Sequence, residues 1–435
     1  MVKPKIINIL YHTPPYDLYK DNCPAIHWRI APGEGGWIGI WGTDWPDILG
    51  NEILKVTDHL DYEVWQPDLR ALSEYSHRFP TGLTHKLFPA RLVSFQHGRK
   101  VKKQPVSQAI VDAIHREAKL GPVILHLNSD PLVPLNTQII EACASLPIMI
   151  SFHGVFQSPA QQIFRVRKNV GATFSFVQQD RTLKRTIMPA VAAVTYQNDI
   201  QLDYLRHYYD GYTQRLTMGC DFRKWSPGVR LTSKLDWDVD GDTFVLSMAA
   251  RFTPLKQIDK VIQALTAVDA NDEYNFVLLV AGHGTEEYEA YLRETGRFLL
   301  EKKKLRFVGY LDDVTMLSLY RASDLFISAS VMEGCSVSVI KALACGVPIF
   351  STAVGGTYDI MKDGGAGCFV GVNDYPAWEK RLRAILSSSK RVRPMDRQEA
   401  RRLFHWPNIA KEFVKIYRRI SQSDVNLYKS KETDG

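Results

Sequence analysis

The stretch from Ser328 to Thr357, SASVMEGCSVSVIKALACGVPIFSTAVGGT, predicts a loop, a helix, a buried strand and a second loop. Apolar residues from Val337 to Ala344 recur at helical spacing, which indicates a helix with one buried face. Gly346 follows as the stop signal of that helix. Val347 to Ser351 is a short apolar run of the kind found in parallel sheets, and Gly355 with its neighbour opens the next turn.

This arrangement predicts an anion site. Glu333 precedes the first helix, and Gly355 and Gly356 precede the next one, where they allow a ligand to approach the backbone closely. The first N–H groups of a helix have no partner within the helix and attract negative charge. A ligand that carries phosphate is therefore expected at this edge.

Length and composition predict two globular domains. The chain has 435 residues, of which 45% are hydrophobic and 11% aromatic, enough for a core in each domain. Strand, loop and helix units repeat in both halves, which predicts an α/β protein with two doubly wound parallel sheets and a ligand cleft between them. The expected division is a first domain at 1–227, a linker at 228–243, a second domain at 244–405, a final helix at 406–420 and a disordered tail at 421–435.

The cysteine pattern and the charge exclude some classes of protein. Six cysteines are scattered without a C-x-x-C pair, so disulfides and zinc are not expected, and a reducing cytoplasm fits best. No apolar run is long enough to cross a membrane, and the first residues do not resemble a signal peptide. The net charge of +7 attracts anions. A nucleic-acid-binding function is supported by the charge alone, since the sequence contains no motif typical of nucleic-acid recognition.

Two histidines end predicted strands in the first half. His126 lies at the end of the predicted strand Val123 to Leu127, and His153 ends the predicted strand from Pro147 to Phe152, at the sheet edge where α/β proteins bind ligands. A hydrogen-bonded core residue is the preferred interpretation for His126. A glycine cluster, Gly33 to Trp37, lies at an expected strand-to-helix junction, and a flexible loop is its alternative reading.

Two basic segments have open interpretations. The run from His97 to Gln104, HGRKVKKQ, is expected to be a solvated loop. Between Gln157 and Arg185, basic residues alternate with Ile163, Phe164, Phe174 and others. Such a patch suits an anionic membrane surface, although an ordinary helix with a charged outer face explains it as well.

Two cations begin the second domain's first loop. Arg251 and Lys256 follow the predicted strand from Phe244 to Met248 and precede a helix with an apolar face. Cations at the carboxyl end of a strand, beside a helix start, suit a bound anion. An exposed surface pair is the alternative.

These motifs together resemble the retaining glycosyltransferases of the GT-B group called family 4. Their signature, E-G-x-(S/G)-x-x-x-x-E-A-x-A-x-G-x-P followed by a strand and V-G-G, matches from Glu333 to Gly356. The matching motifs run in family order from Gly35 to Tyr417. Two positions differ: Lys341 stands where the family has a second glutamate, and Gln257 stands where it usually has glycine.

The resemblance implies roles for particular residues. Glu333 and, from the opposite domain, His153 are the implied catalytic residues. The implied donor-binding residues are Gly35, Gly36, Arg251, Lys256, Tyr310, Leu311, Ser336, Val337 and Lys341. The resemblance also implies that the final helix packs back on the first domain. Because the family's second glutamate accepts hydrogen bonds from ribose and a lysine has no acceptor, we hypothesise that Lys341 holds ribose or phosphate differently.

The implied reaction moves a sugar from a nucleotide diphosphate to a hydroxyl acceptor, a glycan, a lipid or a small molecule, with retention at the anomeric carbon. Fixed cations and N–H groups would stabilise the leaving diphosphate, so no cofactor or metal is expected. Asp238 and Asp240 form an Asp-x-Asp pair, but they fall in the expected linker, where a turn is the preferred reading.

Two alternatives remain open on the same fold. One is a non-catalytic nucleotide-sugar-binding or regulatory subunit, which Lys341 favours. The other is a sugar-nucleotide epimerase, which needs no acceptor. The sugar, the acceptor, the linkage and the oligomeric state are not predicted, and peripheral contact with an anionic membrane at its inner face remains part of the hypothesis.

Overall fold

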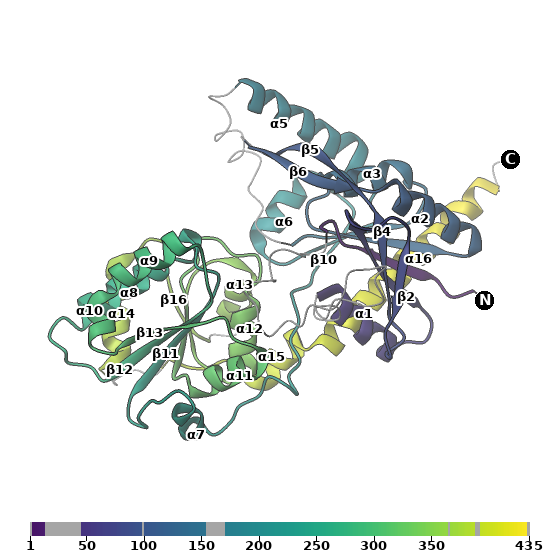
Figure 1. Cartoon of the computed structure of the whole chain (residues 1–435). Helices are drawn as coiled ribbons and strands as arrows, with labels where there is room; N and C mark the ends of the chain where they lie inside the picture. The colour runs from purple at the N-terminus through teal and green to yellow at the C-terminus, as the bar shows by residue number, and fades with distance from the viewer. Residues whose placement is uncertain are drawn as a thin grey trace. The chain divides into compact units, whose positions relative to one another are not determined.

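The computed structural model describes residues 2–13, 45–97, 100–153, 170–363, 366–387 and 392–432 (Figure 1). The chain divides into two compact units. The first contains residues up to Thr217 together with the C-terminal part from Trp406, and the second runs from Met218 to His405. The chain therefore leaves the first unit, completes the second and returns.

The described residues of the first unit form one large sheet. Its strand order is β10-β9-β8-β7-β1-β2-β4-β3, and only β3 runs antiparallel to its neighbour among these pairings. The strands are β1 (Lys5–Ile9), β2 (Asp61–Asp68), β3 (Tyr75–Arg78), β4 (Thr84–Pro89), β7 (Val123–Asn128), β8 (Ile148–Ser151), β9 (Ala193–Tyr196) and β10 (Tyr212–Arg215). The helices are α1 (Trp45–Val56), α2 (Gln108–Leu120), α3 (Pro134–Ala142), α5 (Val170–Thr182), α6 (Asp199–Arg206) and α16 (Trp406–Glu432).

A two-stranded hairpin extends from this unit. β5 (Arg91–His97) pairs antiparallel with β6 (Lys100–Val106). The prediction of a solvated loop for 97–104 was therefore wrong in its described part. The reason is that cross-strand pairing, rather than local composition, decides whether a polar, lysine-rich segment becomes a strand.

The described residues of the second unit form a six-stranded sheet in which all neighbouring strands run parallel, with the order β13-β12-β11-β14-β15-β16. Its strands are β11 (Phe244–Ala249), β12 (Phe276–Ala281), β13 (Leu305–Gly309), β14 (Leu325–Ser328), β15 (Ile349–Thr352) and β16 (Cys368–Val370). Its helices are α7 (Arg230–Leu235), α8 (Ile258–Val268), α9 (Glu286–Thr295), α10 (Arg297–Glu301), α11 (Asp313–Ala322), α12 (Val337–Ala344), α13 (Gly355–Asp363), α14 (Tyr375–Leu386) and α15 (Arg397–Phe404).

The structure differs from the predicted boundaries. The division falls after Thr217, ahead of the expected 227, and the expected linker 228–243 belongs to the second unit. There α7 packs against α11, and the buried Lys234 ammonium donates to the carbonyls of Thr243 at 2.7 Å and Gly241 at 3.0 Å. The expected disordered tail also differs, because α16 continues to Glu432.

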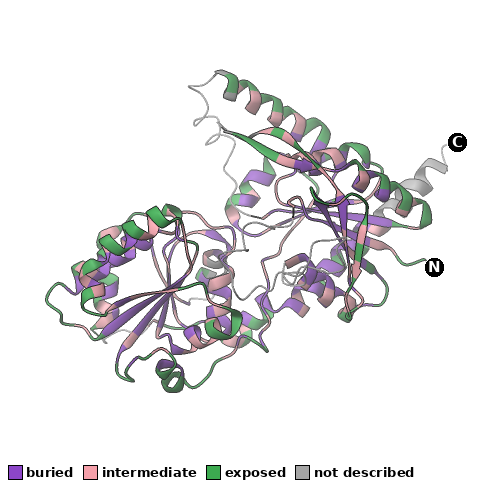
Figure 2. Cartoon of the chain, in the orientation of Figure 1, coloured by how far each residue is buried: buried purple, intermediate pink, exposed green. Residues whose placement is uncertain are grey.

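Both sheets are buried by their helices, and their central strands are almost fully covered (Figure 2). In the first unit α16 packs against α1. The covering helices leave the carboxyl ends of the parallel strands and the loops that follow them to form the sites described below. Within the described residues, we find no helix with the length and apolar character needed to cross a bilayer.

Candidate active site at the carboxyl edge of the second sheet

Glu333 and Lys256 form the centre of the site. The Lys256 ammonium donates to Oε2 of Glu333 at 2.5 Å, and Oγ of Ser330 donates to the same oxygen at 3.1 Å. The side chain of Lys256 is 24% exposed and that of Glu333 is 18% exposed, so this pair is accessible to a ligand without being fully solvated. Lys256 follows β11 and Glu333 follows β14, two neighbouring strands of one parallel sheet.

Backbone contacts fix the loop that carries Glu333. Gly355 has a φ of +77°, and a Cβ there would lie 2.6 Å from the carbonyl oxygen of Glu333. Only glycine fits both the left-handed backbone and this close approach. The N–H of Gly356 donates to the carbonyl of Gly334 at 2.8 Å, and Oγ1 of Thr352 donates to the carbonyl of Ser330 at 2.6 Å. The start of α13 and the end of β15 therefore hold the Glu333 loop.

The loop after β11 supplies a second cation. Arg251 is exposed and makes no hydrogen bond or ion pair with any residue that the structure describes. Lys256 ends a short 3₁₀ turn, and Gln257 then adopts a left-handed φ of 48° before α8 begins. This backbone explains why glycine is usual at that position. The side chain of Gln257 is held in place by a hydrogen bond that its Nε2 donates to Oδ1 of Asn373 at 2.8 Å.

A glycine turn follows β12. Gly282 has a φ of +132°, and a Cβ at this residue would lie 1.9 Å from the carbonyl oxygen of Ala250. The turn therefore lies directly against the loop that carries Arg251. Tyr310 and Leu311 follow β13 at the same edge, where Tyr310 is 46% exposed and its ring centre lies 6.1 Å from that of His283.

Helix α12 begins at the residues predicted to bind the donor. Ser336 is its N-cap, but its side chain makes no capping hydrogen bond and instead lies 3.1 Å from Oγ of Ser338. The side chain therefore leaves the first N–H groups of α12, beginning at Val337, without a cap. Such groups are able to donate to an anion that lies beside Glu333.

Lys341 lies in a cluster of charged and aromatic side chains. Its ammonium is 3.2 Å from Oδ1 of Asp313 and 4.2 Å from the centre of the Trp225 ring. Lys224 donates to the other carboxylate oxygen of Asp313 at 2.5 Å. Burial alone would raise the pKa of Asp313, but the two lysines hold that pKa below its usual value. Lys341 therefore has a carboxylate and an aromatic partner within the protein.

His153 and His126 both lie in the first unit, with different surroundings. Nδ1 of His153 is 3.1 Å from Nε2 of Gln197, its ring centre is 4.3 Å from that of Trp45, and its Nε2 has no hydrogen-bond partner among the described residues. Burial lowers the pKa of His153 to about 4, so it is neutral at pH 7. Among the described residues the imidazole therefore keeps one ring nitrogen available for a ligand.

His126 is instead fully satisfied inside the core. Its Nδ1 lies 2.7 Å from the Tyr417 hydroxyl and 3.1 Å from Nδ2 of Asn8, and its Nε2 lies 2.6 Å from Oγ of Ser151. Burial lowers its pKa to about 3. The interpretation of His126 as a core residue is thus supported by every contact it makes.

The structure gathers most of the predicted residues along one edge. Arg251, Lys256, Tyr310, Leu311, Glu333, Ser336 and Val337 all follow carboxyl ends of the second sheet, whereas Lys341 lies further along α12. Gly35 and Gly36 lie outside the described residues. Sequence reasoning missed Ser330, Thr352, Asp313 and Trp225. No sequence motif marks these four residues, because each one contacts the site loop or a predicted site residue only in the folded chain.

No group of three or more potential metal ligands occurs among the described His, Cys, Asp and Glu side chains. The arrangement offers two cations, uncapped N–H groups and one carboxylate. The cations and N–H groups can bind a diphosphate, and the carboxylate can accept hydrogen bonds from hydroxyl groups next to it.

The sequence is similar to curated proteins over part of its length. The chain is 27% identical over 232 residues to D-inositol 3-phosphate glycosyltransferase of Saccharomonospora viridis, covering 51% of this chain and 54% of that protein. It is 27% identical over 187 residues to an uncharacterised glycosyltransferase of Methanocaldococcus jannaschii, covering 41% and 46%. The chain thus spans about half the length of the curated relatives it matches.

Solved structures match over nearly the whole chain. Sucrose-phosphate synthase from Thermosynechococcus elongatus has a TM-score of 0.66 at 16% identity, with 97% of this chain and 100% of that chain covered. Anabaena HepE in complex with UDP and glucose has a TM-score of 0.62 at 13% identity, with 95% and 99% covered. These likenesses confirm the predicted fold of two Rossmann-like domains, GT-B.

The family model described as "Glycosyl transferases group 1" matches residues 231–402. That range contains the whole candidate site of the second unit, from Arg251 to Lys341. Residues 231–402 are thus similar to the group 1 glycosyltransferases, in agreement with the predicted resemblance, and the GT-B fold around them fits that similarity.

Proposed function

We propose that this protein transfers a sugar from a nucleotide diphosphate sugar to a hydroxyl acceptor, with retention at the anomeric carbon and without a metal ion, as family 4 enzymes do. The observation that carries the proposal is the contact between Lys256 and Glu333, on a loop that also carries Arg251, an exposed cation with no hydrogen-bond or ion-pair partner among the described residues. A carboxylate and two cations at helix starts match a sugar joined to a diphosphate.

The geometry suggests separate roles for the cations and for the carboxylate of the site. When the bond between the anomeric carbon and the diphosphate oxygen breaks, the electron pair leaves with the diphosphate. Arg251, Lys256 and the N–H groups at the start of α12 would stabilise that charge without reorganising. Glu333 would face the sugar, and its negative charge would favour the cationic character that develops at the anomeric carbon. The acceptor oxygen then forms the new bond to the anomeric carbon, and its proton passes to the oxygen of the leaving diphosphate.

His153 would contribute from the first unit. Its neutral ring, with one unpaired nitrogen, suits a hydrogen bond to a hydroxyl of the sugar or of the acceptor. Gly35 and Gly36 remain proposed donor contacts. We place the activity in the cytoplasm, with peripheral contact to an anionic membrane face.

The first experiment is thermal unfolding with and without UDP, GDP, ADP and TDP. Binding at about 100 times the dissociation constant adds roughly 2.7 kcal/mol, which shifts the midpoint by a degree or more. UDP is the first nucleotide to test, because HepE was solved with UDP. D-inositol 3-phosphate is the first acceptor to test, because the S. viridis relative is named a D-inositol 3-phosphate glycosyltransferase.

Transfer itself is then measured with the matching sugar nucleotide, in the presence of EDTA. We expect Glu333→Gln to lower kcat by about 100-fold or more while nucleotide binding persists. Lys260→Gln, a nearby surface change, should leave kcat unaltered. Full activity of Glu333→Gln, or activity that EDTA abolishes, would overturn the proposed mechanism.

A non-catalytic nucleotide-sugar-binding subunit is the second candidate. The contact of Lys341 with Asp313 favours it, because that lysine is engaged by the protein itself. A nucleotide-dependent thermal shift without turnover of any sugar nucleotide, with or without acceptor, would select this candidate. Conversion of the donor without an acceptor would instead indicate the epimerase.

A further inference from the structure

His153 and Gln197 occupy matching positions after two neighbouring strands of the first unit. β8 pairs parallel with β9, with Ser151 opposite Thr195. The hydroxyl oxygens of these two residues lie 2.7 Å apart, so both side chains are on the same face of the sheet. His153 and Gln197 each follow two residues later, and alternate residues along a strand project to the same side. The pair therefore continues the row of Ser151 and Thr195 beyond the strand ends.

Neighbouring contacts hold both members of the pair in place. The N–H of Gln197 donates to Oε1 of Gln201 at 2.5 Å, and the N–H of Gln201 donates to Oδ1 of Asn198 at 2.9 Å. Asn198 is the N-cap of α6, so this exchange is a variant of the capping box, and it fixes the segment between β9 and α6. On the other side, the Trp45 ring packs on the imidazole of His153, with 4.3 Å between the ring centres, and restricts its rotation.

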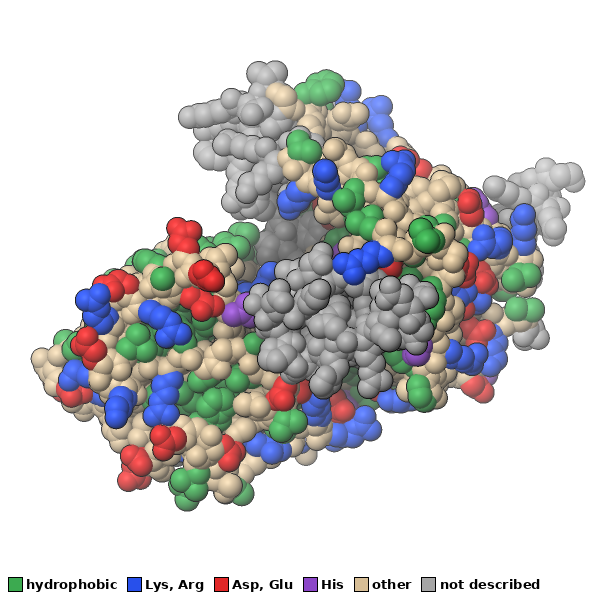
Figure 3. Space-filling model, in the orientation of Figure 1, with side chains coloured by type: hydrophobic (Ala, Val, Ile, Leu, Met, Phe, Trp, Pro, Cys, Tyr) green, Lys and Arg blue, Asp and Glu red, His purple; other side chains and the backbone are tan. Residues whose placement is uncertain are grey.

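The side-chain amide of Gln197 is shielded from water. Charged side chains of both signs are interspersed over the face of the molecule drawn in Figure 3, where water can satisfy them. Gln197 is only 3% exposed, so the orientation of its amide depends on contacts within the protein. In the structure its Nε2 lies 3.1 Å from Nδ1 of His153. Since an amide nitrogen donates hydrogen bonds and accepts none, Nδ1 is the acceptor in this bond.

This bond decides where the proton of the neutral imidazole lies. Burial lowers the pKa of His153 to about 4, and a neutral imidazole carries a proton on only one of its two ring nitrogens. Because Nδ1 accepts, Nε2 carries the proton. Nε2 is buried and has no hydrogen-bond partner among the described residues. A buried N–H without an acceptor is unfavourable, so this atom is prepared for an oxygen of a ligand.

We propose that Gln197 is a positioning residue that holds His153 in the tautomer protonated at Nε2, so that His153 donates a hydrogen bond to an oxygen of the bound sugar. This inference rests on the proposed sugar transfer and adds a residue and a direction of hydrogen bonding to it. An imidazole with Nε2 protonated and Nδ1 engaged has no free lone pair, so it cannot take the proton of the acceptor hydroxyl. His153 then orients a substrate oxygen and does not act as a general base.

The tautomer is read by nuclear magnetic resonance of the full chain labelled with ¹⁵N-histidine, without nucleotide or sugar. At pH 7 the two-bond couplings should show His153 protonated at Nε2 and unprotonated at Nδ1, and its signals are those that disappear in His153→Asn. Gln197→Glu offers a carboxylate, which accepts a hydrogen bond, so the proton should move to Nδ1 and the pKa of His153 should rise by about 1 or more. His126 adds no charge here, because burial lowers its pKa to about 3.

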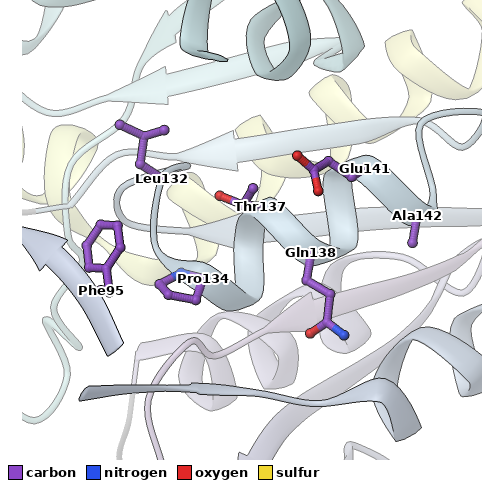
Figure 4. A pocket seen from close by; sticks show the side chains of 7 residues that line it. All are labelled: Phe95, Leu132, Pro134, Thr137, Gln138, Glu141 and Ala142. Carbon is purple, nitrogen blue, oxygen red and sulfur yellow. The ribbon is translucent and has the colours of Figure 1, made fainter. Parts of the chain in front are cut away.

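Sugar transfer gives a second readout. Gln197→Glu should lower kcat/KM about tenfold, the effect of one lost hydrogen bond, while its unfolding midpoint stays near that of the unaltered protein. Gln138→Glu is the matched control and should change neither the tautomer nor kcat/KM. Gln138 lies on α3, where it lines an open groove of about 580 Å³ (Figure 4).

Two results would overturn the proposal. One is a His153 ring protonated at Nδ1 in the unaltered protein, and the other is a proton that stays on Nε2 in Gln197→Glu. The first needs no variant, so it holds even where Gln197→Glu fails to fold. Because the tautomer is read without turnover, absent sugar transfer with the expected tautomers would contradict the proposed function, while the role of Gln197 in fixing the ring would stand.

Discussion

Lys256 contacts a carboxylate that a bound diphosphate would compete with. Its ammonium lies 2.5 Å from Glu333 in the nucleotide-free protein. If the diphosphate takes over this lysine, Lys256→Ala should raise the Kd for the bound nucleoside diphosphate by about 10- to 100-fold, that is about 1.4 to 2.8 kcal/mol. Isothermal titration calorimetry measures this change. Lys260→Ala is the control, since the Lys260 ammonium lies 3.4 Å from the carboxylate of the neighbouring Asp259. Equal affinities would remove Lys256 from the donor site.

Lys341 allows a second test at the scale of one residue. Lys341→Glu places a carboxylate beside Asp313, so we expect the free energy of unfolding to fall by about 1 kcal/mol from like-charge repulsion and the lost ion pair. The ribose hypothesis adds that nucleotide affinity changes by more than about twofold, roughly 0.4 kcal/mol. Urea unfolding and calorimetry measure the two effects separately. Affinity within twofold would show that Lys341 does not take part in nucleotide binding.

Among the elements, the start of α13 is constrained by its backbone. Gly355→Ala requires a left-handed φ of 77° and moves a Cβ to 2.6 Å from the Glu333 carbonyl. We expect a loss of about 1 to 3 kcal/mol in the free energy of unfolding, together with reduced transfer as the Glu333 loop shifts. Gly371→Ala is the matched control, because the nearest atom to its added Cβ would be at 3.5 Å. Urea titration of both variants checks the difference, and equal midpoints would contradict it.

Elements with strong periodicity were predictable from the sequence. The helix from Val337 to Ala344 and the strand from Phe276 to Ala281 have the predicted ends, because each is an apolar run bounded by a turn signal. The β5–β6 hairpin was not predictable in this way. Its strands are polar and lysine-rich, and they exist through pairing with one another and packing on α3.

The sequence predicted those site residues that belong to a recognisable family motif. Lys256 and Glu333 follow separate strands, and the resemblance indicated both, yet their direct contact depends on the strand order of the folded sheet. The engagement of Lys341 by Asp313 was not visible, because the two lie on different helices. The roles of His153, Gly35 and Gly36 stay predictions.

At the scale of the whole molecule, stability should depend on pH through buried histidines. His126 is fully buried, and burial lowers its pKa from 6.5 to about 3. The unfolded chain therefore binds a proton below pH 6.5 that the folded chain does not. Stability is complete above about pH 6.5 and falls as the pH drops toward 3, by at most about 1.4 kcal/mol per pH unit for this group.

Chemical unfolding at several pH values between 7 and 4 measures this slope. His126→Gln should be less stable at pH 7, because it disturbs the contacts with Tyr417 and Ser151, but its stability should fall less steeply with acid. His59→Gln should keep the original slope, since the His59 side chain is 76% exposed. Parallel slopes for all three proteins would contradict the assignment.

The return of α16 to the first unit has a consequence for biosynthesis. The hydroxyl of Tyr417 completes the hydrogen bonding of His126, yet the ribosome makes residue 417 only after the entire second unit. A nascent chain that ends at Thr217 lacks this partner, whereas residues 218–405 are contiguous and form a unit of their own. The half synthesised first is therefore completed last, and part of its core stays without its packing partner until the second unit has been made.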